Sequence, residues 1–144
     1  MSHPMTGDER RAFLLAPGRT GHLATTRADG RAHVAPIWFT LDGDDVVFNT
    51  GANTVKGGNL LRSGRASLSV DLPVLPYAFV HLEGPVTIEQ DPDAFREWTR
   101  TISARYVPYD QVDAYTERNA VSGELLVRLR PETVVAVADL AGWD

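Results

Sequence analysis

The sequence predicts a mainly β fold, a six-stranded antiparallel barrel that is closed or partly split and carries short helices at its ends. Strand-like alternation of apolar and polar residues recurs over several short segments, of which 33–39 and 77–88 are the longest. Turn signals separate successive segments at hairpin distance, at 28–30 and again at 42–45. Helical periodicity is confined to short stretches. Together these patterns favour an antiparallel order over alternating strands and helices.

The first expected element is a short helix. Thr6 is placed to cap it, and Glu9 follows three residues later as in a capping box. The apolar residues 13–15 supply its buried face, and Pro17-Gly18 ends it.

Three strands of an antiparallel meander follow, over 23–26, 33–39 and 46–48. Pro36 lies inside the second of these strands. Because proline cannot donate to a ladder, this strand is expected to lie at an edge, to be bulged, or to open toward a ligand.

The second half of the chain mixes short helices with longer strands. Asn53 is expected to cap the next helix, which Ser63-Gly64 stops, and Asp91 precedes a helix with Phe95, Trp98 and Ile102 on one face. The expected elements are, in order, helix 53–62, strand 66–70, strand 77–88, a helix from 92, a helical segment over 110–118, and strands 125–130 and 133–137.

Composition limits the class of function. The 144 residues suit a single domain, 1–144, and no repeat or linker divides them. There is no cysteine, and the four histidines lack metal-ligand spacing, so no metal site is expected. The net charge of -5 argues against a nucleic-acid partner. With no long apolar run and no signal peptide, the sequence predicts a cytoplasmic protein without a membrane partner.

Residues 48–60 form the most informative segment. A strand runs through Thr50 into a turn that opens a helix, and the chain's one lysine, Lys56, falls at the third helical position if Asn53 is the cap. Free amides and the helix dipole favour anions at such an end. Gly57 and Gly58 are poor helix formers, which indicates close approach of the backbone to a ligand or a strand. The segment therefore predicts a phosphate site, although an ordinary helix cap with a solvated lysine explains the local pattern equally well.

Several segments together resemble the pyridoxamine-phosphate-oxidase-like split-barrel family, and especially its deazaflavin branch, whose members bind coenzyme F420. The segments that carry the resemblance are 21–26 with 29–31, 34–39, 50 with 56–60, and 77–80 with 83–84. The resemblance implies an FMN-binding-like split β-barrel that forms a homodimer with two cofactor sites at the interface. It also implies cofactor-binding roles for Val34, Ala35, Pro36, Ile37, Trp38, Thr50, Thr54, Lys56, Gly57, Asn59, Tyr77 and Phe79, the last two from the second subunit.

One departure bears on the choice of cofactor. FMN-using oxidases of this family usually place an arginine just before the matching lysine, where this chain has Val55. Their substrate-binding arginine and histidine also have no counterpart in residues 139–144. The resemblance therefore implies an oxidoreductase that transfers a hydride from reduced coenzyme F420 to a small unsaturated substrate. An FMN-binding oxidoreductase and a non-catalytic carrier of coenzyme F420 remain the alternatives.

No catalytic residue can be named from the sequence, because it offers no convincing triad. Trp38 is either core packing or a wall of the cofactor site, and Trp98 is expected in the core. Trp143 is expected either to cap the pocket in a dimer or to lie at the surface.

Overall fold

A computed structural model describes residues 1–142, so Trp143 lies outside the described residues. The elements in chain order are β1 (His3–Pro4), α1 (Gly7–Leu15), β2 (Gly21–Thr26), β3 (Ala32–Ile37), β4 (Thr40–Asp42), β5 (Asp45–Gly51), α2 (Val55–Ser63), β6 (Arg65–Leu72), β7 (Ala78–Ile88), α3 (Pro92–Tyr106), the 3-10 turn η1 (Tyr109–Gln111), α4 (Val112–Asn119), β8 (Glu124–Leu129) and β9 (Thr133–Ala138). The expected mainly β class is confirmed.

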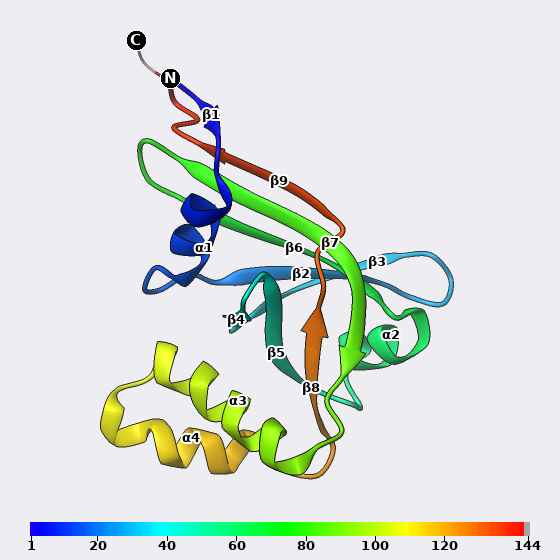
Figure 1. Cartoon of the computed structure of the whole chain (residues 1–144). Coiled ribbons are helices and arrows are strands. Elements are labelled where there is room, and N and C mark those ends of the chain that lie inside the picture. The colour runs from blue at the N-terminus through cyan, green and yellow to red at the C-terminus, as the bar shows by residue number, and fades with distance from the viewer. Residues whose placement is uncertain (143–144) are drawn as a thin grey trace.

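The strands form one curled antiparallel sheet, an open half-barrel in the order β3-β2-β6-β7-β8-β5-β4 (Figure 1). The described residues make nine strands rather than six, counting the two-residue β1, which pairs with β9. The expected strand over 33–39 also divides, because Trp38 and Phe39 leave the ladder between β3 and β4. The two free edges, β3 and β4, agree with a split barrel.

The strand β7 joins the two halves of the sheet. It pairs with β6 along most of its length and with β9 through Phe79–Glu83, and its last residues, Val86–Ile88, pair with β8. The link between β8 and β9 crosses β7 at Gly84, where an added Cβ would lie 1.9 Å from the carbonyl oxygen of Arg130. Only glycine allows the two backbones to approach this closely, so Gly84 permits the sheet to split.

Local signals place several of the helix ends, and one expected cap is wrong. Thr6 and Glu9 form the expected capping box on α1, and Asp91 caps α3. Gly64 ends α2 in the left-handed conformation, at φ 66°. The expectation that Asn53 caps α2 is wrong, because the Thr54 side chain accepts the Gly57 amide instead. Lys56 is therefore the second helical residue and not the third.

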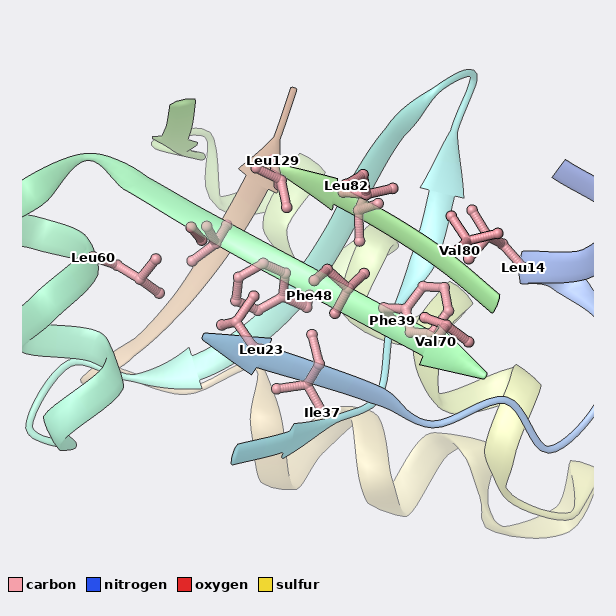
Figure 2. Packing of buried hydrophobic residues seen from close by; sticks show 14 residues of the cluster. Leu14, Leu23, Ile37, Phe39, Phe48, Leu60, Val70, Val80, Leu82 and Leu129 are labelled. Atoms are coloured by element: carbon pink, nitrogen blue, oxygen red, sulfur yellow. The ribbon is translucent and has the colours of Figure 1, made fainter. Parts of the chain in front are cut away.

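The core lies inside the curl of the sheet. Phe39 and Phe48 are fully buried at its centre, and Leu60 of α2 points into the same cluster (Figure 2). A second, smaller cluster joins β5 and β8 to α3 through Val47, Leu126 and Ile102, with Trp98 packed against it as expected. The helical hairpin α3–α4 is thereby fixed beside β4 and β5 (Figure 1).

Within residues 1–142, no helix has the length and apolar character that crossing a membrane would require. No group of three or more potential metal ligands gathers in the same part of the chain.

Candidate functional site

A cleft of about 340 Å³ opens between the half-barrel and the α3–α4 hairpin. Its walls come from the end of β3, the start of α2, the paired strands β5 and β8, and the two helices of the hairpin. The lining residues are Thr20, Pro36, Ile37, Trp38, Asn49, Lys56, Ile102, Ser103, Asn119 and Glu124. Residues more than 60 positions apart in the chain thus meet in one cavity.

The β3 wall is apolar and held in place by the helical hairpin. Pro36 pairs with His22 only on the β2 side, so β3 is an edge strand, which is one of the three possibilities that the proline left open. The Trp38 indole stacks on the Tyr106 ring with centroids 4.9 Å apart and planes 2° from parallel. The Tyr106 hydroxyl donates to the carbonyl of Arg19 at 2.7 Å. Trp38 is 40% exposed, so this fixed aromatic side chain still presents surface to the cleft.

The start of α2 forms the polar end of the cleft. Thr54 donates from its hydroxyl to the Gly51 carbonyl at 2.7 Å and accepts the Gly57 amide at 3.0 Å. The amides of Val55 and Lys56 have no hydrogen-bond partner in the part of the chain that the structure describes. Two free donors at the positive end of a helix dipole can bind an anion.

Two opposite charges face this end of the cleft. The half-buried Lys56 ammonium makes no hydrogen bond or ion pair with any described residue. Burial lowers the pKa of Lys56, whereas the negative charge of Glu124 raises it. Burial likewise raises the pKa of Glu124, and Lys56 lowers it. The lysine is therefore a partly desolvated cation without a direct partner, which suits an anionic ligand.

The two neighbouring glycines of α2 differ, contrary to the expectation that both allow close approach. A Cβ on Gly57 would lie 2.1 Å from the carbonyl oxygen of Gly51, whereas a Cβ on Gly58 would meet nothing within 4 Å. Gly57 thus lets α2 begin directly against the end of β5, and Gly58 has no such role.

This difference gives a matched pair of variants. Gly57→Ala should lower the free energy of unfolding by about 1–3 kcal/mol, because the methyl group forces α2 away from β5. Gly58→Ala should raise it by about 0.5–1 kcal/mol through better helix propensity. Urea unfolding of both variants checks the pair, and equal effects of the two substitutions would contradict it.

The structure brings four of the sequence-predicted residues into the cleft, namely Pro36, Ile37, Trp38 and Lys56. Three others surround the start of α2 without lining the cleft: Thr50 is buried with its hydroxyl 3.4 Å from that of Thr54, and Gly57 is packed as described above.

The remaining predicted residues lie outside the cleft of this single chain. Val34 and Ala35 belong to β3 but do not line the cavity. Asn59 is buried and donates to the Thr25 hydroxyl at 3.0 Å, so it ties α2 to β2. Tyr77 and Phe79 lie at the opposite end of β7 from the strand's junction with β8, and their contribution from a second subunit stays a prediction.

Six lining residues were not predicted from the sequence: Thr20, Asn49, Ile102, Ser103, Asn119 and Glu124. Asn49 donates to the Thr99 hydroxyl at 3.0 Å, which ties β5 to α3. For the α3 residues the sequence contains one signal of a polar contact. Thr99 and Ser103 interrupt the apolar face of α3 one turn apart, and both are buried.

Comparison with known proteins identifies the family. Residues 6–138 match the family described as pyridoxamine 5'-phosphate oxidase. The chain belongs to this family. A search of curated proteins gave no match.

Solved structures similar to this member of the pyridoxamine 5'-phosphate oxidase family differ in what they are said to do. The conserved hypothetical protein Rv2991 from Mycobacterium tuberculosis is 22% identical, with a TM-score of 0.78 over 92% of this chain and 84% of its own. An F420 reductase is 27% identical, with a TM-score of 0.69 over 85% of this chain and 94% of its own. The haem storage protein HutZ from Vibrio cholerae is 17% identical, with a TM-score of 0.69 over 90% of this chain and 93% of its own.

These likenesses confirm the split-barrel fold. Membership of the pyridoxamine 5'-phosphate oxidase family supports a flavin-type cofactor and either an oxidoreductase or a binding protein as the class of function.

Proposed function

We propose that the protein binds coenzyme F420 in the cleft at Lys56 and acts as an oxidoreductase on a small unsaturated substrate. The observation that carries the proposal is the unpaired Lys56 ammonium beside the two free amides of Val55 and Lys56, in a cleft with an aromatic wall. This donor set fits the phosphate group of a flavin-type cofactor.

Each wall of the cleft has a role in this proposal. Lys56 and the amides at the start of α2 bind the phosphate through charge-assisted hydrogen bonds. Pro36, Ile37 and Trp38 provide an apolar surface for the ring system, and the stack on Tyr106 keeps Trp38 in one orientation. The α3–α4 hairpin forms the opposite wall of the cleft through Ile102, Ser103 and Asn119. When bound, reduced coenzyme F420 supplies a hydride from its deazaflavin ring, and the protein supplies binding and orientation.

Two observations favour coenzyme F420 over FMN. Position 55 is a half-exposed valine, so no arginine stands beside Lys56 to share a doubly charged phosphate. The F420 reductase is also the most similar in sequence, at 27% identity, among the three solved structures described above. FMN binding on the same fold is the alternative.

A haem-binding role, suggested by HutZ, has less support in the cleft. The ten described lining residues include no histidine, cysteine, methionine or tyrosine that could be an axial ligand. A cofactor carrier without turnover has the same binding site as the enzyme, so only an activity measurement separates the two.

The proposal includes a homodimer. Tyr77 is 43% exposed, and the outer edge of β3 pairs with no described strand, so both are open to a second subunit. In a dimer of the proposed kind, Tyr77 and Phe79 of one subunit complete the cofactor site of the other.

A titration in parallel with coenzyme F420, FMN and haem tests the proposal. We expect coenzyme F420 to bind most tightly of the three. We also expect the reduced cofactor to be oxidised when an enone or quinone substrate is added. Preferential binding of FMN would favour the alternative cofactor, and binding of coenzyme F420 without turnover on any substrate of this class would favour the carrier.

A further inference from the structure

The carboxylate of Glu124 lies at the same end of the cleft as Lys56. Glu124 begins β8 and pairs in register with Gly51, the last residue of β5. A Cβ on Gly51 would lie 3.6 Å from Glu124 Oε1, and the Gly51 carbonyl accepts from Thr54 at the cap of α2. The β5–β8 register therefore fixes a negative charge beside the anion-binding end of the helix.

The residues that the structure describes offer the Glu124 carboxylate no hydrogen-bond partner. The side chain is partly buried, yet it makes no hydrogen bond or ion pair with any described residue. Burial raises its pKa, and among the described residues the charge that lowers this pKa is that of Lys56. Placing an unpaired carboxylate in such a position costs free energy. This cost suggests a role in what the cleft binds.

The charge balance of the cleft identifies that role. Lys56 and Glu124 are the only charged residues among the ten that line it, so its net side-chain charge is zero. The terminal phosphate of FMN is a monoester and carries a charge of about -1.5 to -2 at neutral pH. The phosphate of coenzyme F420 is a diester and carries a single negative charge. In this neutral cleft the diester leaves one negative charge unbalanced, whereas the monoester leaves about two next to a carboxylate.

We propose that Glu124 is a specificity-determining residue that makes the cleft accept a singly charged phosphodiester and disfavour a doubly charged phosphomonoester. This inference rests on the proposed binding of a flavin-type cofactor at Lys56. The carboxylate would discriminate between the two phosphates by electrostatic repulsion, because this repulsion increases with the charge on the phosphate.

The test compares Glu124→Gln with the unchanged protein in titrations with FMN, riboflavin and coenzyme F420 at low salt. Glu124 repels about two charges on the phosphate of FMN and one on the phosphate of coenzyme F420. We therefore expect the affinity for FMN to rise about tenfold and the affinity for coenzyme F420 about threefold. Riboflavin, which lacks the phosphate, should bind with unchanged affinity. Glu97→Gln is the matched control, since Glu97 is an exposed residue of α3 outside this cleft and its removal changes the net charge equally.

Several outcomes would overturn the role of Glu124. These are FMN binding by Glu124→Gln that is no tighter than in the unchanged protein, an equal gain for riboflavin, or an equal gain in Glu97→Gln. Failure of the proposed function has a different result, because the unchanged protein would then bind coenzyme F420 no better than FMN. The rise in FMN affinity of Glu124→Gln over the unchanged protein would still decide the role of the carboxylate.

Discussion

Lys56→Ala should weaken the binding of coenzyme F420 by about 10- to 150-fold, which corresponds to about 1.5–3 kcal/mol for one charge-assisted phosphate contact. The thermal midpoint of unfolding should hardly change, because the ammonium makes no hydrogen bond or ion pair with the described residues and its desolvation is unfavourable. Fluorescence titration and thermal unfolding of the same preparation measure both quantities.

Lys56→Arg is the control for this variant. It keeps the positive charge at the second position of α2 and should retain most of the affinity, although its planar guanidinium changes the geometry of the contact. Unchanged affinity in Lys56→Ala would refute the anion site at the start of α2. A large loss of stability in the same variant would instead assign Lys56 to the fold.

The second large effect is expected on stability at Gly84. Gly84→Ala should lower the free energy of unfolding by about 3 kcal/mol, because the new methyl group would lie 1.9 Å from the carbonyl oxygen of Arg130. Both atoms belong to or are fixed by backbone, so no side-chain rotation relieves the overlap. Either the link between β8 and β9 moves or β7 does, and hydrogen bonds such as Arg130 to Pro85 at 3.0 Å are strained.

Urea unfolding measures this effect, with Gly58→Ala as the control for adding a methyl group where space is open. Recovery of Gly84→Ala only as insoluble protein, under conditions that give soluble Gly58→Ala, would also agree with the expectation. A midpoint equal to that of the unchanged protein would show that the crossing over β7 adapts to a side chain.

Local hydrogen bonding explains which parts of the fold were predictable. The Thr6–Glu9 capping box, the Asp91 cap and the Gly64 stop each involve residues only a few positions apart. The shift of the α2 cap from Asn53 to Thr54 shows the limit of such reasoning. Both residues can cap a helix, and the position of the Gly51 carbonyl, which holds the Thr54 amide at 3.2 Å, is set by the end of β5.

The parts of the candidate site that could be predicted are those that a single segment of the sequence contributes. Trp38 and Lys56 both line the cleft; Trp38 directly follows β3 and Lys56 is the second residue of α2, two elements whose local pattern the sequence displays. Asn59 shows the opposite case: it belongs to the same motif, but the contact with Thr25 of β2 ties it to the fold. Side-chain chemistry at one position does not reveal which neighbour will satisfy it.

By itself, the sequence determined the mainly β class, the helix caps that depend on nearby residues and the lone lysine near a helix start. It left the Pro36 strand as an edge strand, a bulged strand or a strand open toward a ligand. Only the tertiary structure decided that Glu124 and Lys56 line the same cleft, that α3 forms one of its walls, and that Gly84 rather than another glycine lets the barrel split. The physical reason is range: caps and turns are satisfied within a few residues, whereas these contacts depend on strand register and helix packing between distant segments.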